Sequence, residues 1–185
     1  MQTASVVKAR IHGAGPRTKD YMVYRAIAVL AVCAGLVSCT HHATTASSPH
    51  ITVYYCRAGT DQLVRMPFSV DSKLAAPAVA SYALGQLVAG PSTSRDQLVL
   101  FPAGTVATVS LDGDLATVNL DGPIARSFQS GAGDEAGLFK SLTYTMTGLP
   151  GVQRVQVTVA GARRASLPGG HFELDEPLTR DTFAQ

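Results

Sequence analysis

The chain has 185 residues, a formal net charge of +2 and hydrophobic residues at 46% of its positions. Five of its fifteen basic residues, but only one of its thirteen acidic residues, precede Cys39. From Cys39 onward the chain keeps ten basic and twelve acidic residues, a net charge of −2. Nucleic-acid binding depends on a surplus of cationic side chains that contact phosphates. The composition therefore argues against a nucleic-acid partner.

A short apolar run near the start of the chain ends at a cysteine. Residues 26–37 carry no charge, Arg25 precedes them, and the small residue Ser38 stands directly before Cys39. A membrane-spanning helix needs ~20 apolar residues, whereas a basic start, a short apolar run and a small residue are the anatomy of an export signal. The pattern resembles a bacterial lipoprotein signal. It implies that residues 1–38 are removed and that the Cys39 thiol carries a lipid.

This interpretation sets the expected domain boundaries. A signal that begins at Met22 is more compact than one that begins at Met1, so Met22 is a second candidate for the translation start. Residues 39–50 are rich in Thr, Ser and His without apolar periodicity, and they predict a flexible tether. A flexible tract does not hold ligands in fixed geometry, so its histidines are not interpreted as a metal site. One folded domain is expected over residues 51–185.

Hydrophobic periodicity predicts six elements in this domain. Apolar and polar residues alternate in the expected strands, apolar residues recur every three or four positions in the expected helices, and Gly or Pro ends each helix. The expected elements are a strand over 51–56, a helix over 76–88, strands over 106–111 and 116–120, a helix over 134–148 and a strand over 154–159. Residues 169–174 are a further candidate for a short edge strand. The order β-α-β-β-α-β predicts an α+β fold with one mixed sheet and two helices packed on one face.

The two middle strands form a hairpin whose register follows from their side chains. Pairing Leu111 with Ala116 places the apolar side chains of both strands on one face and closes the hairpin through Gly113 and Asp114. The other face carries short polar side chains, joined by two from the last strand: Thr108, Ser110, Thr117, Asn119, Gln156 and Thr158. This face is a candidate surface for a protein partner. The alternative is that it is simply the solvated side of the sheet.

Eight segments, taken in order, resemble the GerMN (sporulation and germination) domain family. Together they span nearly all of residues 51–180, and they are 51–55, 87–91, 101–105, 116–120, 142–147, 150–152, 155–161 and 177–180. The best-known members of this family are envelope proteins. The resemblance implies an α/β fold that is used in protein contacts, and it supplies no catalytic residues to transfer to this chain.

No set of residues in the sequence predicts catalysis. After the tether, His171 is the one remaining histidine, and no nucleophile motif or phosphate-binding loop accompanies it. Cys56 lies in an apolar strand and is interpreted as a small buried side chain. Asp112, Asp114 and Asp121 are expected to crowd one end of the hairpin, where a weak calcium site is the alternative to ordinary turn chemistry. We therefore expect no enzyme, no cofactor and no metal.

Two functions of different classes remain. In the first, the protein is a lipoprotein anchored through Cys39 to the extracytoplasmic face of the cell membrane, and its GerMN-like domain binds another envelope protein without catalysis. In the second, it is a small-molecule receptor or carrier that uses a pocket between the sheet and the helices. A cavity of several hundred Å³ would take much of so small a core, so the sequence favours the first. An enclosed pocket in the structure would favour the second.

Overall fold

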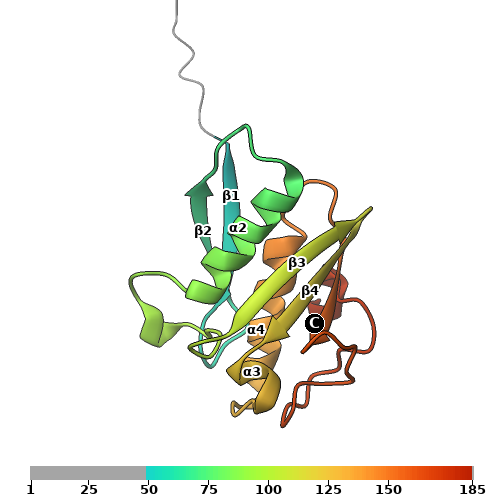
Figure 1. The fold of residues 1–185 in the computed structure, drawn as a ribbon. Coiled ribbons are helices and arrows are strands. Elements are labelled where there is room, and N and C mark those ends of the chain that lie inside the picture. The colour runs from blue at the N-terminus through green and yellow to red at the C-terminus, as the bar shows by residue number, and fades with distance from the viewer. Residues whose placement is uncertain (1–48, 185) are drawn as a thin grey trace, which may run out of the picture. The chain divides into compact units, whose positions relative to one another are not determined.

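The structure, a computed structural model, describes residues 49–184. The predicted signal and Cys39 lie outside these residues, while the first strand begins at His50, the last residue of the predicted tether. None of the helices in the described part of the chain is long and apolar enough to cross a membrane. In chain order (Figure 1) the elements are β1 (His50–Cys56), β2 (Leu63–Ser69), α2 (Ala76–Ala89), η1 (Arg95–Gln97), β3 (Val106–Asp112), β4 (Leu115–Asp121), α3 (Pro123–Arg126), α4 (Ala132–Met146), β5 (Arg154–Val159) and η2 (Arg180–Phe183).

The strands form two sheets, so the α+β class is confirmed but the prediction of one mixed sheet was wrong. β1 and β2 form an antiparallel pair, and β4 lies between β3, which is antiparallel to it, and β5, which is parallel to it. β1 stays apart because its outer edge faces a helix. The Tyr54 and Cys56 amides donate to the hydroxyls of Thr145 and Ser141 of α4, at 2.9 and 2.8 Å.

Helix α4 can approach β1 this closely because a stripe of small residues faces the strand. Gly137, Ser141 and Thr145 recur every fourth residue, which places them on one side of the helix. A Cβ at Gly137 would lie 3.0 Å from the Cys56 sulfur, so a larger residue would push the strand away. The neighbouring side of α4 supplies Leu138, Leu142 and Met146 to the core. The helix therefore joins the two sheets.

Strand β2 is absent from the predicted order of elements. Its Val64, Met66 and Phe68 alternate with exposed residues and pack, partly buried, against the core. Pro67 in the middle of the run lowers any expectation of a strand, because proline cannot donate to a ladder. The structure tolerates it because β2 pairs on one side only, with β1.

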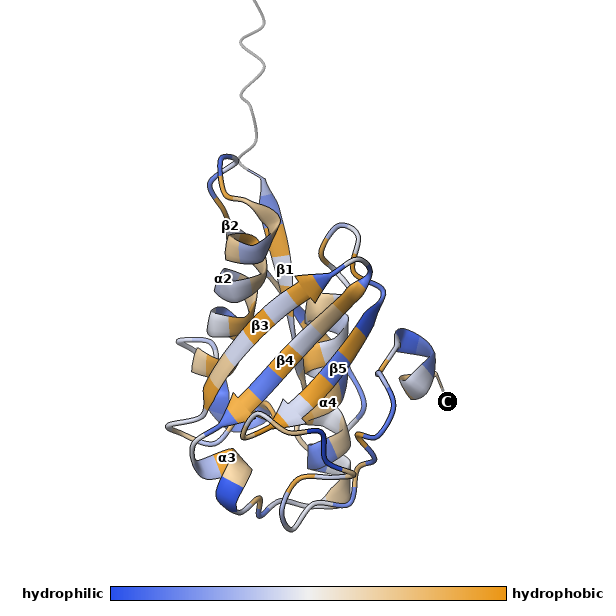
Figure 2. Ribbon diagram, turned by 45° about the vertical axis from the view of Figure 1, so that its right-hand side comes forward, coloured by the Kyte–Doolittle hydropathy of each residue, from blue (hydrophilic) through white to orange (hydrophobic). Residues whose placement is uncertain are grey.

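The β3–β4 hairpin has the predicted register. Leu111 pairs with Ala116, and Gly113 and Asp114 form the two-residue turn. Helices α2 and α4 lie on the same face of the three-stranded sheet (Figures 1 and 2), as expected. The prediction that three aspartates crowd one end of the hairpin was wrong, because Asp121 pairs with Val106 at the end opposite the turn.

Two further local predictions need correction. Helix α4 begins at Ala132, two residues before the expected start at residue 134, and its N-cap Gly131 provides no side-chain cap. The expected edge strand over 169–174 does not form. Three buried leucines hold the segment after β5 against the domain: Leu167, Leu174 and Leu178. Of these, Leu178 pairs with Val155 of β5.

Candidate interaction surface

The outer face of the β3–β4–β5 sheet carries the polar side chains that the sequence selected. Figure 2 shows this face, with hydrophilic and hydrophobic residues alternating along each strand. Thr108 and Ser110 of β3 are exposed, while Thr117 of β4 is half-buried. Val106, which is 58% exposed, is a further residue of this face that the prediction left out. The same alternation that selected Thr108 and Ser110 places Val106 beside them.

Gln156 is not available on this face. Only 3% of it is exposed, because the C-terminal segment covers it. Its amide Nε2 donates to the carbonyl oxygens of Leu174 and Val157 at 3.2 and 3.1 Å, and its Oε1 accepts from Arg163. Its burial follows from contacts made by residues 163–174, which the strand pattern of β5 does not reveal.

Asn119 and Thr158 hold the strand end that lies next to this covered region. The Asn119 Oδ1 accepts from the Thr158 Oγ1 at 3.1 Å and from the Gly161 amide at 2.7 Å. Both side chains are half-buried, and their polar groups are used in hydrogen bonds that hold the turn after β5. The open part of the face therefore lies over β3 and the neighbouring side of β4.

An ion pair fastens the hairpin turn to the start of β5. The Arg154 guanidinium donates to both carboxylate oxygens of Asp114, at 2.7 and 3.1 Å. Its hydrogen bond to the Asp114 carboxylate lowers the pKa of that carboxyl below its usual value. Asp114 thus has a structural partner, and Asp121 accepts from the Gly122 amide at 2.6 Å. Among residues 49–184, no group of three or more His, Cys, Asp or Glu side chains is placed to hold a metal ion.

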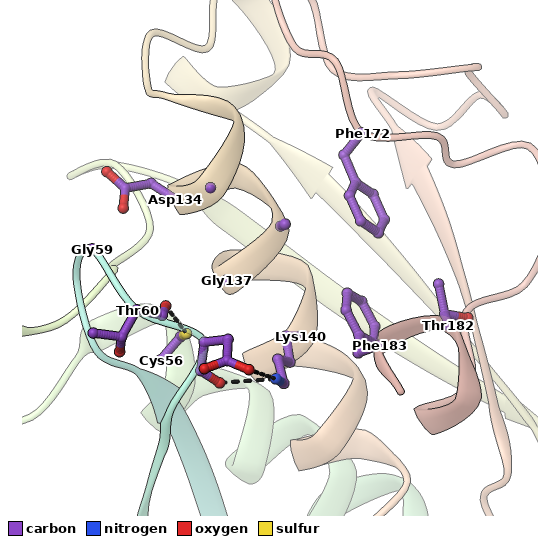
Figure 3. Close-up of a pocket in the computed structure, with 12 residues that line it drawn as sticks. Cys56, Gly59, Thr60, Asp134, Gly137, Lys140, Phe172, Thr182 and Phe183 are labelled. Atoms are coloured by element: carbon purple, nitrogen blue, oxygen red, sulfur yellow. Dashed lines mark hydrogen bonds and ion pairs between the residues drawn. The ribbon is translucent and has the colours of Figure 1, made fainter. Parts of the chain in front are cut away.

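A cleft of about 410 Å³ opens beside helix α4. It is lined by Cys56 and Thr60 on one side and by Phe172 and Phe183 on the other, with Lys140 between them (Figure 3). The two phenyl rings stack with centroids 5.6 Å apart. The cleft is open to solvent and does not lie between the sheet and the helices, where the small-molecule alternative requires a pocket. The core there is filled by side chains.

The chemistry of this cleft does not support catalysis. Burial raises the pKa of the Cys56 thiol, which disfavours the thiolate that a nucleophile needs. The thiol donates to the Thr60 carbonyl at 3.3 Å. The Lys140 ammonium is already engaged, because it donates to the Asp61 carbonyl at 2.8 Å and lies 3.7 Å from the Asp61 carboxylate. Cys56 is therefore a packed side chain beside a closed ion pair.

Comparison with solved structures identifies relatives of the fold. The first GerMN domain of the sporulation protein GerM from Bacillus subtilis is 20% identical, with a TM-score of 0.57, and the match covers 72% of this chain and 98% of that domain. A candidate lipoprotein from Clostridium perfringens is 21% identical, with a TM-score of 0.50, and the match covers 71% of this chain and 89% of that one. At these identities the likeness shows the fold alone.

Comparison with sequences gives the family. No curated protein matches the chain at a significant level. Residues 52–165, however, match the Germane family, which is described as sporulation and spore germination. That match covers more than half of the chain and includes every strand and helix from β2 to β5. The chain belongs to the Germane (GerMN) family.

Proposed function

We propose that this chain is a lipoprotein of the cell envelope, anchored through Cys39 on the extracytoplasmic face of the membrane, and that its GerMN domain binds another envelope protein without catalysis. The observation that carries the binding role is the open polar side of a sheet whose inner side is fully packed. Thr108 and Ser110 are exposed there, while the core beneath is packed with apolar side chains.

The position of Cys39 supports a domain held near the membrane. Nine residues separate Cys39 from Pro49, the first described residue. Fully extended, such a segment spans at most ~35 Å. A partner of the domain must then be reachable close to the bilayer, which favours another envelope protein over a partner in solution.

The side chains of the open face suit protein contact. Threonine and serine have few rotatable bonds, so they lose less conformational entropy on being covered than Lys or Glu would. Their hydroxyls can donate and accept hydrogen bonds, so a polar partner leaves few of them unsatisfied. Thr108, Ser110 and Thr117 carry no charge. A partner that covers these three side chains therefore does not have to desolvate a charged group.

The anchor is tested by labelling with a fatty-acid probe in a bacterial host. Cys39→Ser should abolish labelling and leave the uncleaved precursor, because it removes the acceptor thiol. Cys33→Ser is the matched control, since it changes a cysteine within the apolar run and should leave labelling intact. Continued labelling of the Cys39→Ser chain would refute the anchor.

The binding role is tested by crosslinking in membranes, followed by recovery of the tagged chain. Thr117→Arg places a long cation in the middle of the open face and should reduce recovery of a crosslinked partner. Gln129→Arg is the control, because Gln129 is exposed and lies outside the sheet. Both variants should melt close to the parent. Equal recovery with the two variants would place the partner away from this face.

A further inference from the structure

Three of the four outer strand edges in residues 49–184 are covered or protected. The hydroxyls of α4 bond the edge of β1. The edge of β5 pairs at isolated bridges with Ala162 and Leu178. The edge of β2 carries Arg65 and Pro67, which discourage the addition of a further strand. The edge of β3 has no Lys, Arg or Pro, and no described backbone group outside its own hairpin bonds to it.

Helix α2 packs against β3 on the inner side of the sheet, and a hollow lies at each end of their junction. We call this junction the α2–β3 groove. At its first end a cleft of about 490 Å³ is lined by Leu84 and Gly85 of α2 and by Ala107 of β3. At its second end a cleft of about 360 Å³ is lined by Val79 and Leu111. Ala107 and Leu111 are roughly 13 Å apart along the strand, so an extended segment of five residues would reach both clefts.

Gly85 is an independent sign that something approaches this groove. A glycine inside a helix costs about 1 kcal/mol relative to alanine, and Gly85 lies in the middle of the 14-residue α2. Nothing in the described structure requires it, since a Cβ at this position would meet no atom within 4 Å. It lines the first cleft. A glycine at such a place allows the backbone of a ligand to come close.

We propose that the α2–β3 groove binds an extended segment of a partner protein, which adds to β3 as a further antiparallel strand. In a hairpin closed by a two-residue turn, ladder bonds join alternate pairs that begin beside the turn. Ala107, Val109 and Leu111 are then expected to direct their N–H and C=O groups away from β4. A segment on this edge satisfies those groups with its own backbone.

The walls of the groove specify the side chains of the segment. Side chains opposite Ala107, Val109 and Leu111 face α2 and the two clefts, so the segment needs apolar residues at three alternate positions. Arg95 lines the first cleft, and Asp71 lines the second. An antiparallel segment ends at the Arg95 side, so it should begin with a basic residue and end with an acidic residue or a free carboxylate.

A second copy of this chain is a poorer occupant of the groove. Helix α2 lies along β3 on the inner side of the sheet (Figure 2), so pairing two β3 edges would bring two α2 helices to the same junction. Neighbouring strands are about 4.8 Å apart, whereas packed helices need 8–10 Å. A single extended segment carries no helix and avoids this conflict. The proposal deepens the interaction role proposed above by naming its surface and the chemistry of its partner.

The test uses the full chain, purified from its host in detergent, and a fluorescent peptide, Lys-Val-Thr-Val-Thr-Val-Glu. Fluorescence anisotropy should show saturable binding, and the charge-reversed peptide Glu-Val-Thr-Val-Thr-Val-Lys should bind at least several-fold more weakly. Gly85→Phe fills the groove from the α2 side, where an added Cβ meets no atom within 4 Å, so it should weaken binding at least tenfold. Gly85→Ala adds a single methyl group at the same place, so it should weaken binding measurably but less than Gly85→Phe does. Both variants should melt no lower than the parent.

Binding that is unchanged by Gly85→Phe would overturn the proposal, as would no binding by the full chain. If deletion of residues 41–48 were needed to reveal binding, the tether would be the natural occupant, and the proposal of a partner segment would fail. The peptide reports on the groove alone. Its failure would leave the Cys39 labelling result and the Thr117→Arg crosslinking result standing, so the two proposals can fail separately.

Discussion

A buried carboxylate leads to a sharp prediction for Gly170→Ala. Glu135, in the first turn of α4, is fully buried, and its Oε2 accepts from the His171 amide at 2.6 Å. A Cβ at Gly170 would collide with the Glu135 Oε1 and lie 2.9 Å from its Cδ and 3.1 Å from the Leu167 Cβ. Because Glu135 is fully buried and its Oε2 is held by the His171 amide, we expect the C-terminal segment to move away.

The magnitude follows from the two effects that this movement combines. Overpacking a filled site costs about 1–3 kcal/mol, and loss of a hydrogen bond to a charged group costs about 1.5–3 kcal/mol. Movement of the segment relieves the overpacking but breaks the hydrogen bond, so the two costs do not add in full. We therefore expect about 3 kcal/mol in total for Gly170→Ala. For a domain of this size that lowers the melting temperature by roughly 10 °C. Urea unfolding and thermal melts of the full chain measure both quantities.

A double-mutant cycle identifies the cause. Glu135→Ala removes the group that a new Cβ would meet, so in that background Gly170→Ala should cost less than about 1 kcal/mol. An interaction energy of about 2 kcal/mol between Glu135 and Gly170 is therefore expected. Equal costs in the two backgrounds, or a Gly170→Ala chain that melts like the parent, would refute the reasoning.

Two further predictions concern the sheet and the core. Asp substitutions should cost about 4 kcal/mol or more at the buried Val157, about 1 kcal/mol at the half-buried Thr158 and close to nothing at the exposed Thr108, and equal urea midpoints for the three variants would contradict this order. Burial raises the pKa of Tyr55 from 10.0 to about 12, so the folded state keeps its proton where the unfolded state loses it. Stability present below pH 10 should then fall by about 2 kcal/mol as the pH rises to 12. Tyr55→Phe should flatten this fall, and an unchanged alkaline slope in that variant would refute the assignment.

The parts of the fold that the sequence predicted are those set by local periodicity. The hairpin register was correct because a shift of one residue would bury Thr108 or Ser110 in place of Val109. The ends of α2 were predictable from Pro77 and Gly90, which respectively begin and stop a helix. These signals lie within a few residues of the structure that they specify.

The parts that were missed depend on contacts between distant residues. The separation of β1 from the second sheet follows from α4 hydroxyls about 90 positions away, which bond its edge in place of a strand. The burial of Gln156 follows from Arg163 and Leu174, which lie in a segment without strand or helix periodicity. No periodicity within β1 or β5 reports which segment covers it. The polar face was therefore predicted larger than it is.

The C-terminal segment also bears on where a partner can bind. The family match ends at residue 165, yet Leu167, Leu174 and Leu178 beyond it are buried, and Leu178 pairs with Val155 at the edge of β5. A sheet of three strands has two edges, and this segment closes one of them. Strand addition to the three-stranded sheet is thereby directed to β3, where Val106 and the exposed hydroxyls already face solvent. The same closure explains why Gln156 is buried while Thr108 is exposed.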